Sequence, residues 1–387
     1  MTEERERAGE ADPVEAVQSG SGSSPGADAP RRSRSRRPLF TPRQGLALTA
    51  LALTLLLAAL VLYLLFFLGR PRSFRQDQPR AGVQAVWAVY GPGEGELPQF
   101  ASPMGIAVRA RDRIYVTDAG NDRVCVFDPY GRYLFSFGEL GVAKPLSGGA
   151  NTYERGRLNY PVGIDTDEDG NVYVASFGND SIEVFSPDGE PLRRFPDPLA
   201  RVGLGASGKG GTGIAVTDVA VHQGLVYALD TYQVVVFTVE GGYVGQWGRP
   251  GSGEGALDHP NGITVGDDGT VYVSDSNNCR VTAFGPGGSV IWSVGTPPSA
   301  IRDTSTRPFQ LPRGLSFVPG DGLIVTDAFG FSLVQISLDG AAFTSVGERG
   351  VEPSQLNFPN DVDVLHEDLV IADKGNGRIQ RLRIVSE

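Results

Sequence analysis

Four aspartates could place carboxylates close together in this chain of 387 residues. They stand near the start of three copies of a repeated sequence pattern and are Asp165, Asp218, Asp361 and Asp363, of which the last two share one copy. Carboxylates gathered near one axis repel one another, so they either share water and backbone N–H donors or hold a cation. A solvated channel lining is the simpler interpretation, and a calcium-assisted hydrolase is the chemical alternative.

The segment DTDEDGNVYVAS, from Asp165 to Ser176, opens like a calcium-binding loop. Asp165, Asp167 and Asp169 would be its first ligands. The twelfth residue is serine, however, whereas such loops need a bidentate glutamate there and a helix after it. The DG pair suits a hairpin turn, because glycine readily adopts a positive φ. We therefore expect a turn here and no cofactor, with calcium as the alternative for the carboxylates.

A second polar group follows the proline that opens most copies of the pattern. Its members are Asn261, Arg313 and Asn360. Three connections between copies are longer than the others, at 138–161, 196–216 and 295–312. The first of them carries Arg155 and Arg157. Insertions on one face of a repeat scaffold commonly form its binding rim. We predict that these five residues bind a ligand, while tolerated surface variation would also explain the longer connections.

The histidines and cysteines do not form a catalytic pattern. His222, His259 and His366 fall in different turns of different copies, so they cannot supply the three or four ligands that zinc needs. Cys125 and Cys279 fall in copies that lie opposite each other in a ring of six, whereas a disulfide requires Cα atoms within about 7 Å. We expect Cys125 to be buried and Cys279 to be a loop thiol. The sequence therefore favours a protein without catalytic activity.

These residues are positioned by a pattern that recurs six times from about Gln84 to the C-terminus. Its clearest copy is PNGITVGDDGTVYVSDSNNCRVTAFGPGGSVIWSVG, from Pro260 to Gly295, in which four short segments are typical of strands. The residue that closes the second strand recurs every 45 to 58 residues, at Asp118, Ser176, Asp230, Asp275, Asp327 and Asp373. A period of this length predicts an all-β, six-bladed β-propeller of four-stranded antiparallel blades.

The fourth strand is present in only five of the six copies. These five strands end at Phe137, Phe195, Trp247, Val294 and Val346. The missing strand lies before the first copy, in QAVWAVYG at 84–91. We predict that residues 84–90 pair with the last strand of the chain, which closes the ring and removes exposed sheet edges.

The turn between the second and third strands repeats an Asp, an Asn and an Arg. The segments DAGNDRVCVF (118–127), DSNNCRVTAF (275–284) and DKGNGRIQRL (373–382) resemble the NHL repeat, and the similarity covers about 300 residues. The resemblance implies a propeller of similar blades. We assign the recurring Asp and Arg to structure, because an Asp at a turn accepts backbone N–H groups and can pair with Arg.

A propeller of similar repeats, the amidating lyase of peptidylglycine processing, holds its metal with histidines placed just after the opening proline. The same places in this chain carry Met104, Val162, Asn261, Arg313 and Asn360. The resemblance therefore does not extend that lyase chemistry to this chain.

Residues 45–68 are 24 uncharged and mostly apolar residues, which as a helix would span roughly 36 Å, more than the bilayer core of about 30 Å. Six arginines between residues 31 and 43 precede this segment, and four between residues 70 and 80 follow it. The difference predicts a cytoplasmic N-terminus and an extracytoplasmic propeller. We expect a disordered cytoplasmic tail at 1–43, a transmembrane helix at 44–69, a linker at 70–82 and the propeller at 83–387.

Beyond residue 80 the chain carries 22 basic and 37 acidic side chains, a net charge near −15. Binding to phosphates needs clustered Lys and Arg, so we exclude nucleic acid as a partner. The face that carries the longer connections and the Asp-Asn-Arg turns is called the long-loop face. We predict a single-pass membrane protein that contacts the bilayer through one helix and binds a protein, peptide or glycan on the long-loop face, without catalysis. The alternative is a metal-assisted hydrolase or lyase with its site in the axial channel.

Overall fold

The computed structural model describes residues 82–93, 99–109, 112–140, 155–195, 215–297 and 307–385, together with five positions between Leu53 and Leu60. The chain divides into two units, Met1–Asp77 and Gln78–Glu387. No helix within these described ranges is long and apolar enough to cross a membrane. The predicted tail, transmembrane segment and linker lie almost entirely outside the described residues.

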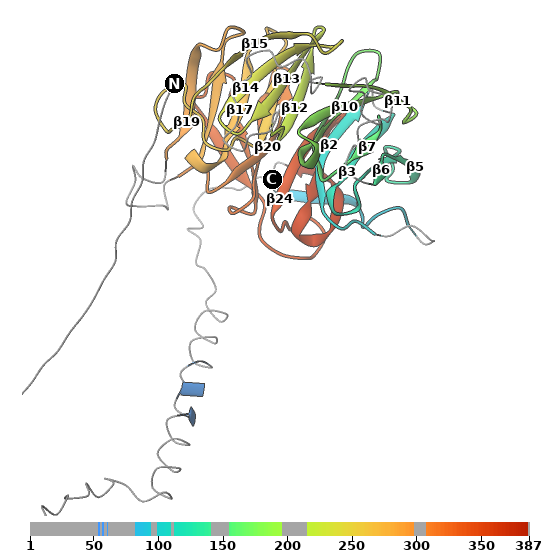
Figure 1. Ribbon diagram of the computed structural model, residues 1–387. Helices are drawn as coiled ribbons and strands as arrows, with labels where there is room; N and C mark the ends of the chain where they lie inside the picture. The colour runs from blue at the N-terminus through green and yellow to red at the C-terminus, as the bar shows by residue number, and fades with distance from the viewer. Residues whose placement is uncertain are drawn as a thin grey trace, which may run out of the picture. The chain divides into compact units, whose positions relative to one another are not determined.

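The second unit contains six four-stranded antiparallel sheets, numbered here as blades 1 to 6 in chain order (Figure 1). The strands of blade 1 are β2 (Pro103–Arg109), β3 (Arg113–Asp118), β4 (Arg123–Phe127) and β5 (Tyr133–Phe137). Blade 2 contains β8 (Pro161–Thr166), β9 (Val172–Ser176), β10 (Ser181–Phe185) and β11 (Pro191–Phe195). Blade 3 contains β12 (Asp218–His222), β13 (Leu225–Asp230), β14 (Gln233–Thr238) and β15 (Tyr243–Trp247).

The remaining blades repeat this arrangement. Blade 4 contains β16 (Gly262–Val265), β17 (Val271–Asp275), β18 (Arg280–Phe284) and β19 (Val290–Gly295). Blade 5 contains β20 (Pro312–Val318), β21 (Gly322–Asp327), β22 (Ser332–Ile336) and β23 (Phe343–Val346). Blade 6 contains β24 (Pro359–Leu365), β25 (Asp368–Asp373), β26 (Arg378–Val385) and β1 (Gly82–Val89). The predicted all-β, six-bladed propeller is therefore confirmed.

Blade 6 is completed by the strand that comes first in the chain. β1 pairs antiparallel with β26, from Gly82 opposite Val385 to Val89 opposite Ile379. The Trp87 indole then donates to the Pro129 carbonyl of blade 1 at 3.2 Å. The predicted pairing of residues 84–90 with the last strand is confirmed, and the sheet has the order β1-β26-β25-β24.

The core lies between adjacent blades rather than inside any one of them. Each buried apolar cluster joins neighbouring blades, and the cluster between blades 6 and 1 includes Phe127, Val370 and Ile379. The aromatic residues that end the fourth strands contribute to this packing. Phe137 lies 4.7 Å from Phe185 of blade 2, and Phe195 lies 5.3 Å from Phe237 of blade 3, between ring centroids. A blade of this kind is stable only beside its neighbours.

The first strands of the blades contact one another around the axis, in the order β2, β8, β12, β16, β20, β24 and back to β2. The strands approach one another closely around the axis, and a side chain near the start of most of them would clash with the neighbouring blade. This explains why most of these strands have a glycine there. A Cβ at Gly163 would overlap the Asp218 carboxylate of the next blade, and a Cβ at Gly314 would overlap that of Asp361.

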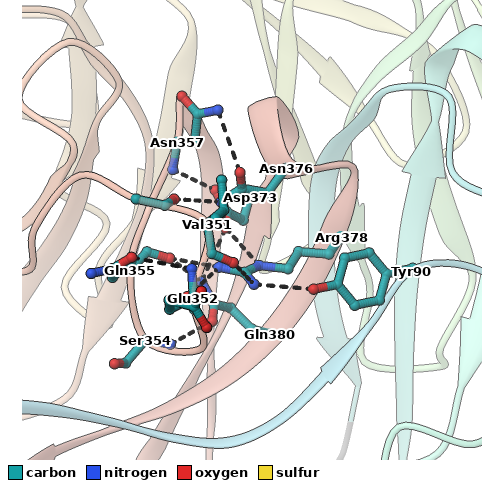
Figure 2. A network of polar contacts seen from close by, with 11 residues as sticks. Tyr90, Val351, Glu352, Ser354, Gln355, Asn357, Asp373, Asn376, Arg378 and Gln380 are labelled. Carbon is teal, nitrogen blue, oxygen red and sulfur yellow. Dashed lines mark hydrogen bonds and ion pairs between the residues drawn. The ribbon is translucent and has the colours of Figure 1, made fainter. Parts of the chain in front are cut away.

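The Asp-Asn-Arg turns hold the connections between blades, as blade 6 shows (Figure 2). Asp373 accepts the Asn357 N–H at 2.7 Å through one oxygen, and through the other it accepts Asn376 Nδ2 at 2.7 Å and Arg378 Nε at 2.8 Å. The buried Arg378 guanidinium donates onward to the carbonyl oxygens of Val351, Glu352 and Gln355 and to the Tyr90 hydroxyl. The structural assignment of these residues is confirmed.

Blade 2 lacks this Asp and Arg. A Glu and an Arg replace them, each one strand farther from the axis than the residue it replaces. Ser176 and Ser181 occupy the two positions and pair across β9 and β10. The buried Glu183 of β10 instead lies 3.2 Å from Arg194 Nε of β11 and accepts the Gly156 N–H at 3.4 Å. An ion pair thus still anchors the connection into this blade.

Both cysteines are free and buried. Cys125 lies on β4, as expected, with no exposed surface. Cys279 lies in the turn after η3 (Ser276–Asn278), as expected, but its side chain is buried and its thiol contacts the Gln310 carbonyl at 3.1 Å.

Candidate functional site

A cavity of about 240 Å³ opens on the long-loop face, at the mouth of the axis. One residue from each blade lines it, at the position directly before or after the first strand begins. These six residues are Met104, Val162, Thr217, Asn261, Arg313 and Asn360. We call this space the mouth cavity. The three predicted residues Asn261, Arg313 and Asn360 are therefore brought together, although their binding role remains a prediction.

Hydrogen bonds fix the polar side chains of the mouth cavity. Arg313 Nη1 donates to Asn261 Oδ1 at 2.7 Å. Asn261 Nδ2 in turn donates to the His259 carbonyl at 2.7 Å and to Ser276 Oγ at 3.1 Å. Asn360 Nδ2 donates to the Met104 carbonyl at 3.0 Å. One of these links joins blades 4 and 5 and holds Arg313 in a defined position, and the other joins blades 6 and 1.

Lys374 joins Arg313 in the mouth cavity and was not predicted. It comes from the short turn η6 (Lys374–Asn376) between β25 and β26. Burial lowers the pKa of the Arg313 guanidinium and of the Lys374 ammonium, and the charge of Arg313 lowers the pKa of Lys374 further. Arg313 Nε is buried and has no hydrogen-bond partner among the described residues. Two cations therefore share one partly desolvated space.

Aromatic side chains surround this cavity on the long-loop face. Tyr160 and Phe177 line it and are 40% and 42% exposed. A neighbouring cavity of about 280 Å³ shares Arg313, Asn360 and Lys374 and adds Phe358, which is 39% exposed. Phe329, 52% exposed, packs against Phe358 with ring centroids 5.3 Å apart. Exposed aromatic side chains beside arginine are typical of binding surfaces.

Tyr160 and Phe358 have an unusual backbone conformation, and His259 of blade 4 shares it. Tyr160, His259 and Phe358 each precede the proline that opens a blade or its first strand, and their φ values are 51°, 49° and 50°. Bulky residues are rare in the left-handed region, and such backbone strain tends to cluster at functional sites. An aromatic residue before the opening proline of blades 2, 4 and 6 was the sequence signal that could have revealed this rim.

Below the mouth cavity, the four predicted aspartates line a narrow channel cavity of about 50 Å³. Each carboxylate bridges two blades, because it accepts the backbone N–H of a residue in the next blade. Asp361 accepts from Ile106 at 2.8 Å and Asp218 accepts from Ile263 at 2.9 Å. Asp165 and Asp363 do the same toward Val221 and Val108, both at 2.7 Å.

The second oxygen of each of these carboxylates accepts the backbone N–H of the residue that follows it in the chain. These donors are Thr166, Val219, Val362 and Val364. All eight oxygens thus have partners. No group of three or more His, Cys, Asp or Glu residues within the described ranges is arranged to hold a metal ion. The aspartates that we considered as metal ligands come together, and in this arrangement they join blades.

Burial strongly favours the protonated form of these aspartates. It raises the pKa of Asp165 to about 7 and that of Asp218 to about 8. Burial and the charge of Asp218 together raise the pKa of Asp361 well above its ordinary value. Burial also raises the pKa of Asp363. Carboxyl groups that share an axis in this way are partly neutral near pH 7.

Arg155 and Arg157 do not reach the mouth cavity, contrary to our expectation of a rim around the axis. Arg155 Nη1 donates to the Leu192 carbonyl at 3.0 Å, on the outermost strand of blade 2. Arg157 belongs to β7 (Arg157–Leu158), which pairs in parallel with β6 (Glu139–Leu140). Neither arginine lines the mouth cavity, and Arg155 contacts the strand of its blade that lies farthest from the axis.

The remaining motifs take the places expected of structural elements. Asp167 lies in the hairpin between β8 and β9, where the Asp167 N–H donates to the Asn171 carbonyl and Gly170 has a φ of 83°. The turn predicted in place of a calcium loop is confirmed. His222 ends β12 and His366 follows β24, on the opposite face from His259.

Comparison with known proteins supports the repeat and the fold. A sequence model described as NHL repeat matches residues 257–284, which include β16 to β18 of blade 4. Over 221 residues the chain is 27% identical to Protein brain tumor of Drosophila melanogaster. The matched region covers 56% of this chain and 15% of that relative, so the chain spans a small part of its length.

Two solved structures have similar folds. A protein of unknown function from Bacteroides thetaiotaomicron has a TM-score of 0.56 at 17% identity, over 78% of this chain and 75% of its own. A streptogramin B lyase structure has a TM-score of 0.50 at 13% identity, over 75% of this chain and 95% of its own. At these identities the likeness concerns the fold alone. The chain is thus a six-bladed β-propeller, and its residues 257–284 match the NHL-repeat model.

Proposed function

We propose that this propeller is a non-catalytic binding module whose long-loop face holds a partner protein or peptide. The observation that supports this best is the mouth cavity. Residues from all six blades line it, two of its lining residues are the cations Arg313 and Lys374, and exposed aromatic side chains form its rim. Arginine and aromatic residues dominate the energetic centres of protein interfaces. A glycan would also find aromatic side chains there, but few unused hydrogen-bond acceptors.

The axial aspartates do not favour the hydrolase or lyase alternative. Each carboxylate already accepts two backbone N–H groups, so a general base or a set of metal ligands would have to give up bonds that join blades. The residues of the mouth cavity include no histidine or cysteine that could act as a nucleophile or base. Binding is the function that this chemistry supports.

We further propose that the propeller is displayed outside the cytoplasm by a single transmembrane helix. The support is the sequence alone: 24 uncharged residues at 45–68 and an excess of arginine before them. A net charge near −15 beyond residue 80 suits a soluble domain near a membrane and disfavours nucleic acid.

The test compares aromatic side chains on the two faces. The full chain, carrying an affinity tag, is purified in detergent from cells as wild type and as the Phe177→Ala and Phe329→Ala variants. The matched control is Tyr130→Ala, which removes an aromatic ring that is 74% exposed in the β4–β5 turn of the opposite face. Capture of a discrete partner should fall at least about tenfold with the first two variants and stay unchanged with the control. Equal capture by all four proteins would reject the proposal.

A further inference from the structure

We propose that the mouth cavity is a subsite for a carboxylate of an acidic peptide, which Arg313 and Lys374 bind together. This inference rests on the proposed function and specifies the chemistry of the partner. Three features of the cavity support it: two cations that form no ion pair with a described residue, unused hydrogen-bond donors, and small size.

The charge argument compares Arg313 with other buried arginines. Arg123, Arg280 and Arg378 each form an ion pair with an aspartate of their own blade, at 3.0, 2.8 and 2.8 Å. Arg313 and Lys374 form no ion pair with any described residue. Removing a charge from water is costly unless an opposite charge compensates it. An anionic group placed between the two cations would supply that compensation.

The hydrogen-bond argument concerns which atoms of the cavity remain unused. Asn261 Oδ1 already accepts from Arg313, and both oxygens of Asp218 and of Asp361 accept backbone N–H groups. The unused donors are the Nε and Nη2 edge of Arg313 and the ammonium of Lys374, neither of which donates to a described residue. Arg313 Nη2 and the Lys374 ammonium can each donate a charge-assisted hydrogen bond to one carboxylate.

A carboxylate fits these donors better than a hydroxyl group does, because an ionised carboxylate only accepts hydrogen bonds. A sugar hydroxyl would need acceptors in return, and Asn360 Oδ1 is the one side-chain amide oxygen of the cavity without a described partner. A phosphate dianion is disfavoured as well, since Asp218 and Asp361 line the floor of the same cavity. A single negative charge suits two cations above these aspartates.

The size argument points to one side chain of a larger partner. Small-molecule pockets usually hold roughly 300 to 1,000 Å³, and the mouth cavity holds about 240 Å³. The side chain of an aspartate or a glutamate would enter it, while flanking apolar residues of the peptide would contact Tyr160 and Phe177 on the rim. The hydrogen bond to Asn261 positions Arg313 for this contact before the peptide arrives.

The experiment presents the full chain, immobilised in detergent, with two mixtures of C-terminally amidated hexapeptides that differ in one fixed position and contain no Asp or Glu at the other positions. One mixture has Glu there, and the other has Gln. Retained peptide is measured by mass spectrometry for wild type, Arg313→Gln, Lys374→Gln and the control Arg132→Gln. Arg132 lies in the β4–β5 turn of the opposite face, with a side chain that is 77% exposed.

Wild type and the control should retain the Glu mixture about tenfold better than the Gln mixture, the size of one charge-assisted hydrogen bond. The ratio should approach one in Arg313→Gln and in Lys374→Gln. Lys374→Gln removes no hydrogen bond to a described residue, so it tests the site even if Arg313→Gln folds poorly. Equal retention of the two mixtures by wild type would overturn the inference, and so would a Glu preference that survives both substitutions.

A third probe, a hexuronate oligosaccharide, separates a glycan acid from a peptide acid. Retention of this probe through Arg313 and Lys374, with no retention of either peptide mixture, would overturn the peptide assignment. Failure of the inference is distinguishable from failure of the proposed function. Loss of partner capture in Phe177→Ala without any Glu preference would reject the inference alone.

Discussion

At the scale of the residue, the buried side chain of Arg378 joins its own blade to the connection from blade 5. Its guanidinium has no exposed surface, pairs with Asp373, and donates to three carbonyl oxygens of the connection from blade 5. Within the connection a backbone N–H reaches only one of these three carbonyl groups, that of Glu352, which accepts from Gln355 at 3.1 Å. One side chain thus replaces several backbone partners.

Removing this side chain should therefore be costly. We expect Arg378→Ala to lower the free energy of unfolding by about 3 to 5 kcal/mol, because it leaves the buried Asp373 without its cation. Arg132→Ala breaks a surface ion pair with Asp128 and should cost less than about 1 kcal/mol. Urea unfolding monitored by tryptophan fluorescence measures both. Similar costs for the two variants would contradict the structural role assigned to Arg378.

Sequence reasoning recognised the Asp-Asn-Arg turns as structural, because their residues recur in phase with the blades. It did not find the substitute in blade 2. Glu183 and Arg194 stand one strand further out than the residues they replace, and their contact depends on the register that sets Glu183 opposite Arg194. A search along the chain compares equivalent positions, so it sees only two serines where an Asp and an Arg are expected.

The buried acids give the stability a defined dependence on pH. The pKa is about 7 for Asp165 and for Glu183 and about 8 for Asp218, each raised by burial from an ordinary value near 4. At a pH between the ordinary pKa and the raised pKa, the folded state binds more protons than the unfolded state, so the free energy of unfolding falls as the pH rises. The slope is about 1.4 kcal/mol per pH unit for each such proton.

We therefore expect the full chain to be less stable at about pH 8.5 than at about pH 6. The free energy of unfolding in urea, followed by the fluorescence of the three tryptophans, measures the difference. Acids whose pKa is lowered, such as Asp368, titrate below this range and do not obscure it. Equal or greater stability at the higher pH would show that the buried carboxylates are not protonated in the folded state.

At the scale of the element, the pairing of β1 with β26 decides whether the ring is closed. Trp87 of β1 packs on the β4–β5 turn of blade 1 and donates to the Pro129 carbonyl. Trp292 of β19 makes the same kind of contact with the Leu338 carbonyl of blade 5, at 2.9 Å. The interface that closes the ring thus has the same construction as an interface within the continuous chain.

This equivalence leads to a prediction for the two tryptophans. Trp87→Ala and Trp292→Ala should each lower the free energy of unfolding by about 3 kcal/mol, because each removes a large ring and a hydrogen bond at an interface between blades. Chemical denaturation of the two variants provides the comparison. A cost near zero for Trp87→Ala, beside a full cost for Trp292→Ala, would mean that β1 does not close the ring in solution.

The closing strand was predictable because only five of the six copies contain a fourth strand. A closed propeller needs four strands in every blade, so the sixth had to come from elsewhere in the chain. The paths of the longer connections were not predictable in this way. The sequence shows how many residues separate two blades, but not whether they turn toward the axis or away from it. For this reason Arg155 and Arg157 were expected at the mouth cavity, which they do not line, and Arg155 instead donates to Leu192 on the outermost strand of blade 2.

At the scale of the whole molecule, the mouth cavity was partly predictable. Positions directly after the opening prolines converge in any propeller, so Asn261, Arg313 and Asn360 could be placed together from the repeat alone. Lys374 and the aromatic rim come from turns and connections whose contribution to the mouth depends on local backbone conformation. The left-handed φ values of Tyr160 and Phe358 are not visible in the sequence.

The proposed orientation across the membrane makes a separate prediction. Tyr130→Cys places one thiol on a position that is 74% exposed, while Cys125 and Cys279 are buried and burial raises the pKa of the Cys125 thiol to about 12. A membrane-impermeant maleimide should label this variant in intact cells as fully as in permeabilised cells, and should leave wild type unlabelled. Labelling that requires permeabilisation would place the propeller in the cytoplasm.

The most direct test of the account is site-specific photo-cross-linking in cells. The photoreactive amino acid benzoylphenylalanine replaces Phe177 on the long-loop face or Tyr130 on the opposite face of the full chain. We predict an adduct of discrete mass from position 177 and none from position 130. Adducts from position 130 alone, or equally from both positions, would contradict the claim that the long-loop face is where this propeller binds its partner.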